Sequence, residues 1–440
     1  MLEVLRSVNA RVLLSLIVGG VVIGTIWTSV RTRHLLHPVF LISLGFFLPL
    51  AAATLRLSGL QVSHWAPETY ALALEAWLLW LVFPCVWLAS AGRQDSWRAP
   101  ERSDQRRGIS AALMWYARIL AILNIAAIIL QNYLTGGLPI LLVDPEVAFE
   151  YHTATVPILQ ILARASFAAC ALLHLAIYYR RRVIDVVLLL LVLLCPLTKL
   201  ARIDLMLSAM TLVLMNAHFP IVNLRSRRGV VGIAALVGLL LGLVELGNQR
   251  LNRFGRYSVS YGDAIGFRAY RGPGEAVAVA YGYFALSFEN LDRFVKENPE
   301  YRTGGLLSFS PLFNALFFVN RLTAGKYPGP DAIVDRRNPV GPMATVETAL
   351  APFYLDFGAG MAWVPMLFYM LVWLWLYSHR HRGFSYVIAY AGYSASMVLS
   401  AFQGVVAAPF IYQGLALALL PFLLPRLSAP PTAVIAGRSS

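Results

Sequence analysis

Residues 183–198 read VIDVVLLLLVLLCPLT, and this apolar run decides the fold. An α-helix needs about 20 mostly apolar residues to cross a bilayer, and similar runs recur along the whole chain. No segment alternates like a barrel strand, so helices are expected to form the spans. The sequence predicts an all-α polytopic membrane protein with about eleven transmembrane helices, at residues 12–30, 38–55, 69–90, 110–131, 157–178, 183–198, 203–219, 229–247, 353–377, 384–402 and 404–424.

The composition supports one integral membrane protein. The chain of 440 residues is 58% hydrophobic and 13% charged, whereas soluble domains have about 25% charged residues. The net charge is +14, and the tendency of cytoplasmic loops to carry arginine and lysine explains part of it without a nucleic-acid partner. The three cysteines lie in apolar runs without disulfide or zinc spacing, and the sequence has neither a Walker loop nor an HExxH motif. No metal or other cofactor is therefore predicted.

Arginine-rich short segments set the predicted orientation. They lie at 93–107, 180–182, 225–228 and 380–382, and alternating spans place all four in the cytoplasm. The orientation of the N-terminal end stays open, because the same alternation leaves two arginines outside. The predicted organisation is a transmembrane part at 1–247, a large extracytoplasmic loop at 248–345, a second transmembrane part at 346–425 and a disordered tail at 426–440.

Two cations lie on the predicted outer side, where the tendency of cytoplasmic loops to carry arginine and lysine does not explain them. The turn CPLTKLARID at 195–204 places Lys199 and Arg202 outside, next to the membrane. They either snorkel to lipid headgroups or face a phosphate at the outer leaflet, since charges at membrane depth usually mark a substrate path.

The long loop is also rich in arginine, whose fork matches phosphate oxygens. Arg268 and Arg271 flank Tyr270 at a spacing of three, which suits a shared anion or a solvated surface. The loop's aromatic residues suit sugar faces or an interfacial belt. The stretch 274–293 predicts a helix with one face formed by Tyr281, Ala285, Phe288 and Asp292.

Three segments together carry a family resemblance. They are TGGLPI at 135–140 with its continuation to Glu150, the outer turn ending in Arg202, and TVETALAPFYLDFG at 345–358. In order and spacing they resemble the bacterial oligosaccharide repeat-unit polymerases, the Wzy-type O-antigen polymerases, over most of the chain. The chain departs from that pattern in lacking an arginine near 149–151 and in the residues before Arg202, where the family often has a glycine.

The resemblance implies a glycosyltransferase of type C in a bacterial inner membrane, with its active site facing the periplasm. Such an enzyme moves a growing glycan from one undecaprenyl pyrophosphate carrier to a sugar hydroxyl of the next lipid-linked unit, without a metal. Its implied partners are the lipid-linked oligosaccharide, membrane lipids, a chain-length regulator and a flippase.

The reaction needs cations that stabilise the leaving group and a carboxylate that takes a proton. The predicted catalytic residues are Arg202 and, as alternative bases, Glu150, Glu275, Glu289 and Asp292. The predicted substrate-binding residues are Lys199, Arg268, Arg271, Tyr281, Asn290 and Tyr354. Structural roles are predicted for Gly136, Gly137, Pro139 and Asp356.

Two other functions remain open. An O-antigen ligase or another lipid-linked glycosyltransferase would use the same donor and a different acceptor. A lipid-linked oligosaccharide transporter is disfavoured, because the sequence shows neither two similar halves nor matching interrupted helices.

Overall fold

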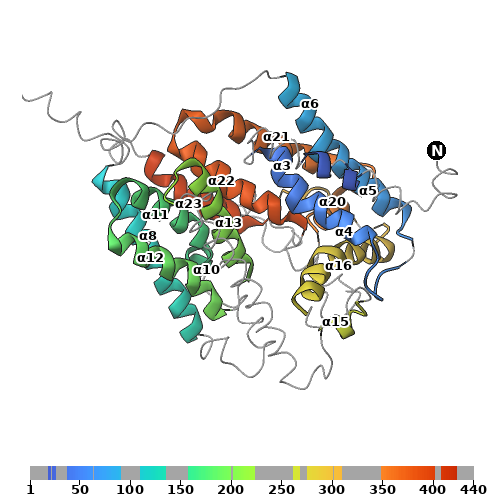
Figure 1. The fold of residues 1–440 in the computed structure, drawn as a ribbon, viewed down its shortest axis with the longest axis horizontal. Coiled ribbons are helices and arrows are strands. Elements are labelled where there is room, and N and C mark those ends of the chain that lie inside the picture. The colour runs from blue at the N-terminus through green and yellow to red at the C-terminus, as the bar shows by residue number, and fades with distance from the viewer. Residues whose placement is uncertain are drawn as a thin grey trace, which may run out of the picture. The chain divides into compact units, whose positions relative to one another are not determined.

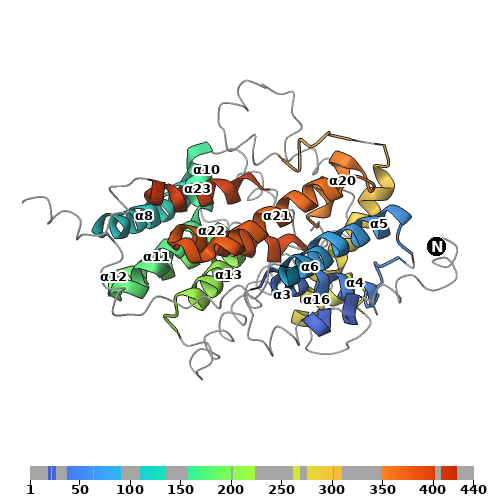
Figure 2. The same ribbon diagram turned by 90° about the horizontal axis from the view of Figure 1, so that it is seen from above.

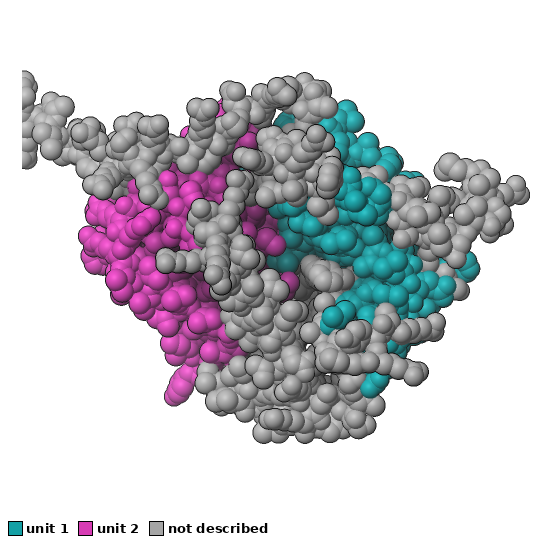
Figure 3. Space-filling model, viewed as in Figure 1, with its two compact units in different colours: residues 1–94, 241–377, 396–409 teal, residues 95–240, 378–395, 410–440 magenta. Residues whose placement is uncertain are grey.

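The protein is all-helical wherever its structure is described. The computed structural model describes residues 18–20, 22–25, 37–62, 64–90, 110–134, 157–199, 202–222, 261–267, 275–300, 302–309, 348–401 and 408–423. Within these ranges every regular element is a helix and none is a strand, as the apolar runs predict. The chain forms two compact units, which consist of residues 1–94, 241–377 and 396–409 and of residues 95–240, 378–395 and 410–440 (Figure 3).

The first unit combines the N-terminal helices with α15 and α16 and with α20 and most of α21 (Figure 1). Helix α3 continues into α4 through the π-helical turn η1, and α5 continues into α6 through the π-helical turn η2. Helices α5 and α6 therefore follow one another as a single rod (Figure 2). Proline stands at the first position of α3 and α5, where its missing N–H is not needed. The elements are α3 (Pro38–Ile42), η1 (Ser43–Phe47), α4 (Leu48–Thr54), α5 (Pro67–Trp77), η2 (Leu78–Val82), α6 (Phe83–Ser90), α15 (Tyr261–Ala264), α16 (Glu275–Glu297), α20 (Leu350–Phe357), most of α21 (Trp363–His379) and η5 (Leu399–Ala401).

An aromatic core holds α16 against the apolar helices of this unit. Phe288 of α16 meets Phe46 of η1 with ring centroids 5.5 Å apart, and Phe46 meets Trp80 of η2 at 4.9 Å. Trp80 in turn contacts Phe353 of α20 and donates its indole N–H to the carbonyl of Met366, at 3.1 Å. The predicted helix at 274–293 is thus confirmed as α16, and the four residues of its predicted inner face are all buried.

The second unit is built around α11, whose residues from Ser166 to Ile177 are all buried. Helix α11 packs against α8, α12 and α13. Phe167, near its start, fits against two glycines, and a Cβ on Gly414 would lie only 2.4 Å from its ring. The elements are α8 (Ala111–Leu134), α10 (Pro157–Arg164), α11 (Ser166–Arg180), α12 (Val183–Leu194), η3 (Cys195–Lys199), α13 (Arg202–His218), η4 (Arg380–Arg382), most of α22 (Phe384–Val398) and α23 (Pro409–Leu423).

Several described helices have the apolar character of membrane spans. By length and composition, Pro67–Trp87 and Ala111–Leu134 could each cross a bilayer. The pair formed by α10 and α11 would add a third span if it counts as one, although it bends by 49° at the break. Shorter apolar helices at Pro38–Thr54, Val183–Thr198, Ile203–His218 and Pro409–Leu423 coincide with other predicted spans. The predicted span at 229–247 and most of 12–30 lie outside the described residues, so the total of eleven stays a prediction.

The structure differs from the prediction at 353–377, where one continuous span is replaced by two helices. Helix α20 ends at Phe357, and α21 starts at Trp363. Gly358 has a φ of 71°, which favours glycine, and its N–H donates to the carbonyl of Tyr354 at 2.7 Å. Hydropathy alone does not register this stop, because the residues on both sides of it are apolar.

Candidate functional site

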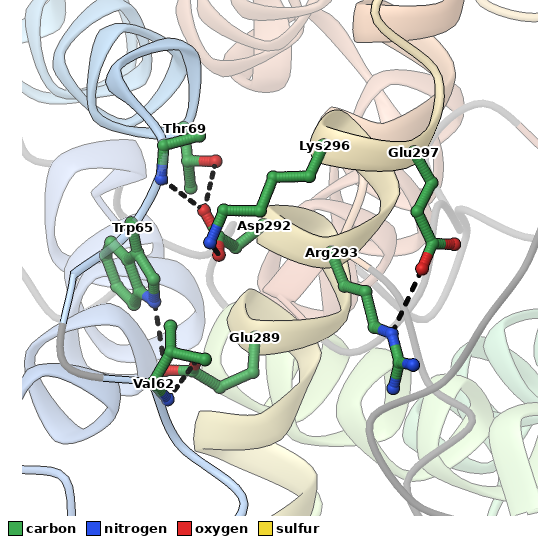
Figure 4. Close-up of polar contacts among 9 residues, drawn as sticks. Val62, Trp65, Thr69, Glu289, Asp292, Arg293, Lys296 and Glu297 are labelled. Atoms are coloured by element: carbon green, nitrogen blue, oxygen red, sulfur yellow. Dashed lines mark hydrogen bonds and ion pairs between the residues drawn. The ribbon is translucent and has the colours of Figure 1, made fainter.

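Glu289 of α16 is buried against the segment that precedes α5. Its carboxylate accepts hydrogen bonds from the Trp65 indole N–H at 2.9 Å and the Val62 N–H at 3.2 Å (Figure 4). It also accepts one from the Gln61 amide at 3.4 Å. Only 1% of the residue is exposed. Hydrogen bonds from protein donors satisfy a buried carboxylate, so Glu289 joins α16 to this segment.

Tyr281 lies two turns before Glu289 on α16 and belongs to the same hydrogen-bond network through Gln61. Its hydroxyl accepts from the Leu57 N–H at 2.9 Å and donates to the side-chain oxygen of Gln61 at 2.7 Å. The amide nitrogen of Gln61 donates to the Ala53 carbonyl at 2.7 Å. The ring of Tyr281 lies 5.2 Å from that of Phe267, and 8% of the residue is exposed, so the predicted role of Tyr281 in substrate binding stays a prediction.

Asp292 lies one turn after Glu289 and serves the start of α5. It accepts from the backbone N–H of Ala66, which directly precedes α5, and from the Thr69 hydroxyl at 2.9 Å (Figure 4). Lys296 completes its partners with an ion pair of 2.6 Å. A carboxylate at a helix start satisfies N–H groups that have no partner within the helix. Asp292 and Glu289 therefore dock α16 onto residues 61–69, and their role as alternative catalytic bases stays a prediction.

Asp356 of α20 anchors a second part of the polar segment. It accepts from the Thr303 hydroxyl, the Ser308 N–H and, at 3.1 Å, the Leu307 N–H. The Thr303 N–H donates to the carbonyl of Leu355 at 2.9 Å. The segment 302–309 is thus held by the end of α20, which is the geometry of a structural anchor.

We expect Asp356→Ala to loosen this segment and Asp356→Asn to do so less. Alanine leaves three donors without an acceptor, at about 1–3 kcal/mol for each one that stays buried. Asparagine keeps one carbonyl acceptor, so its thermal midpoint should fall less than that of the alanine variant. The measurement is the thermal midpoint in detergent, with Asp263→Ala, an exposed carboxylate, as the control. An unchanged midpoint in Asp356→Ala would mean that this carboxylate does not anchor the segment.

Tyr354 is buried beneath Arg302. Its hydroxyl lies 3.3 Å from the carbonyls of Val295 and Asn298, and only 1% of the residue is exposed. The Arg302 guanidinium lies 5.0 Å from the ring centroid and donates to the Pro299 carbonyl at 2.9 Å. Arg302 is exposed at this position, and the predicted role of Tyr354 in substrate binding stays a prediction.

In the second unit, the end of α8 meets the turn between α12 and α13. The Asn132 amide, near the end of α8, donates to the Thr198 hydroxyl in η3 at 2.8 Å. Helix α13 begins at Arg202. A helix start attracts anions through its exposed N–H groups and its dipole. The backbone thus brings the turn of Lys199 and Arg202 to the end of α8 where the segment with Glu150 begins.

The remaining predicted residues are described in part or not at all. Glu275 is the first residue of α16, and Asn290 is buried on that helix. The side chains of Glu275, Lys199 and Arg202 lie outside the described part of the chain. So do Gly136, Gly137, Pro139, Glu150, Arg268 and Arg271 altogether.

Sequence reasoning missed the partners that these residues use. Gln61, Trp65 and Thr69 lie in a short segment whose polar groups gave no recognisable motif. Arg302 was one of several loop arginines without a distinguishing pattern. The one hint of an ordered turn in this segment was Trp65, two residues before Pro67 at the start of α5.

The described residues belong to an all-helical protein whose apolar helices are of the membrane type. Buried carboxylates hold polar segments of the chain against these helices. No group of three or more His, Cys, Asp and Glu residues that could hold a metal occurs in the described ranges. Comparisons with protein families, with characterised proteins and with solved structures found no match.

Proposed function

We propose that this protein is a polymerase of lipid-linked oligosaccharide repeat units in a bacterial inner membrane. The observation that supports it best concerns the stretch PFYLDFG at 352–358, the most specific part of the family resemblance. Two of its residues, Tyr354 and Asp356, hold the polar segment at 295–308. A signature whose side chains position a polar segment next to apolar helices suits an enzyme that works at a membrane face.

The proposed reaction is a displacement at the first sugar of the growing glycan. A hydroxyl oxygen of the incoming unit forms a bond to the anomeric carbon, and the bond from that carbon to the pyrophosphate oxygen breaks. The hydroxyl proton passes to a carboxylate, and the undecaprenyl pyrophosphate leaves with the bonding electrons. Arg202 and Lys199 stabilise the leaving charge, and the start of α13 at Arg202 adds a favourable dipole.

The described contacts narrow the choice of base. Glu289 and Asp292 already accept hydrogen bonds from the segment before α5, and Asp292 also pairs with Lys296. A base needs a lone pair directed at the acceptor hydroxyl. We therefore favour Glu150 or Glu275 as the base and assign Glu289 and Asp292 to positioning.

The proposal includes the surroundings of the enzyme. The active site faces the periplasm, where the predicted outer loop and the turn at Arg202 lie. The donor and acceptor are both undecaprenyl-pyrophosphate-linked, so a flippase must deliver them from the cytoplasmic side. A chain-length regulator is the further expected partner.

Deletion of the gene tests the function directly. We expect the ladder of surface glycans to collapse to a single repeat unit, and a plasmid copy to restore it. Gel electrophoresis of the surface glycan measures both. Loss of every unit from the acceptor would indicate a ligase or an earlier step, and an unchanged ladder would exclude both enzymes.

A further inference from the structure

The second unit has an arginine, Arg164, beside the break between the apolar helices α10 and α11. Arg164 is the last residue of α10, and its side chain is exposed. It lies about 10 Å along the helix from Pro157, at a rise of about 1.5 Å per residue. Charged residues within apolar helices of membrane proteins are rare and usually mark a binding path.

The break beside Arg164 is a stable part of the fold. The Asn124 amide of α8 donates to the carbonyls of Leu162 and Ala163, at 2.7 and 3.3 Å. The Ser166 hydroxyl donates to the other end of the same amide at 3.2 Å. These bonds satisfy the carbonyls that the 49° bend releases from the helix, so the bend and the position of Arg164 are both fixed.

An aromatic ring orients the guanidinium. The Arg164 Cζ lies 5.0 Å from the ring centroid of Phe410, the second residue of α23. The close contact of Gly414 with Phe167 holds the start of α23 against the start of α11. A cation–π contact uses the charge of the guanidinium and none of its N–H groups as hydrogen-bond donors, so these groups can still bind a bidentate acceptor.

The charge of Arg164 has no counter-charge on the neighbouring helices. Helices α8, α10, α11, α22 and α23 contain neither Asp nor Glu. The ion pairs found among the described residues are Arg118–Asp185, Arg293–Glu297 and Lys296–Asp292, and none of them uses Arg164. The described residues around Arg164 therefore leave its guanidinium able to bind an anionic ligand.

We propose that Arg164, Phe410 and the α10–α11 break form a binding site for the phosphate of a membrane lipid. Phosphate is the anion that lipids carry at the edge of the hydrocarbon, and it matches the arginine fork. Ile158, at the other end of α10, is 64% exposed and provides an apolar surface for a lipid chain on the same helix. The lipid is either a bilayer phospholipid or an isoprenoid phosphate; only the second alternative rests on the proposed function.

Lipid binding to the purified full-length protein tests the site by native mass spectrometry. The probes are dioleoyl phosphatidic acid, undecaprenyl phosphate and, as the uncharged reference, dioleoylglycerol. We expect Arg164→Gln to weaken phosphate-lipid binding about tenfold or more, and Arg164→Lys to weaken it less, because lysine lacks the bidentate fork. Phe410→Leu should also weaken binding. Arg182→Gln, at the exposed start of α12, is the matched control and should change nothing.

The two lipid arms separate the sources of the phosphate. A loss for both lipids, or for phosphatidic acid alone, assigns a phospholipid headgroup, and a loss confined to undecaprenyl phosphate assigns an isoprenoid carrier. Unchanged affinity for both lipids in folded Arg164→Gln overturns the site. If that variant does not fold, unchanged binding by both Arg164→Lys and Phe410→Leu overturns it instead. No glycan synthesis is measured, so a failure here is distinct from failure of the gene-deletion test.

Discussion

Replacing Asp185 by alanine is expected to destabilise the second unit by about 3–5 kcal/mol, the usual effect of breaking a buried ion pair from one side. Asp185 is fully buried on α12, and its carboxylate holds Arg118 of α8 at 2.6 Å and 3.1 Å. Without the carboxylate, a buried guanidinium keeps only the ring of Trp115, at 5.5 Å, as a favourable neighbour. Denaturation of the purified protein in mixed micelles measures the change.

Removing the charges of both Arg118 and Asp185 should destabilise the second unit far less than Asp185→Ala does. An Arg118→Met/Asp185→Leu double variant eliminates the desolvation cost of both ions, so its stability should lie well above that of Asp185→Ala. The control is Glu297→Ala, which breaks the exposed pair with Arg293 and should cost no more than about 1 kcal/mol. If Asp185→Ala behaves like this exposed control, the pair does not join α8 to α12 in the folded protein.

The sequence could predict the positions of most described helices, because an apolar run long enough to be buried in lipid is visible without any knowledge of tertiary contacts. It could not predict the breaks. The bend at Ala165 depends on the Asn124 amide from another helix, and the stop at Gly358 depends on one glycine in an apolar stretch. The π-helical turns at 43–47 and 78–82 are equally invisible, since their residues have ordinary helical composition.

The candidate site was predictable as a set of residue types and not as a set of contacts. Acids on α16 suggested bases, yet Glu289 and Asp292 are partners of backbone and indole N–H groups from residues 62–69. Those donors come from more than two hundred positions earlier in the chain. Tyr354 was predicted to bind substrate, and its contact with Arg302, at 5.0 Å from the ring centroid, was not predicted. Contacts between segments this distant in sequence leave no local pattern.

Arg202→Ala is expected to abolish polymerisation while leaving the protein folded. Removing one group that stabilises developing negative charge typically lowers turnover about 100- to 1000-fold, enough to erase a glycan ladder. Arg202 begins α13, and the preceding turn is fixed to α8 through Asn132 and Thr198. Lysine at position 202 keeps the charge without the bidentate geometry, so Arg202→Lys should restore only part of the ladder.

The matched control is Arg182→Ala, because Arg182 precedes α12 at its other end and is exposed. In the predicted topology it faces the cytoplasm, where it cannot reach a periplasmic pyrophosphate. Expression and the thermal midpoint should equal those of the unchanged protein in both variants, and only Arg202→Ala should lose the ladder. A near-normal ladder in Arg202→Ala would mean that this arginine merely extends to lipid headgroups. The cation that stabilises the leaving group would then have to be sought among Lys199 and the loop arginines.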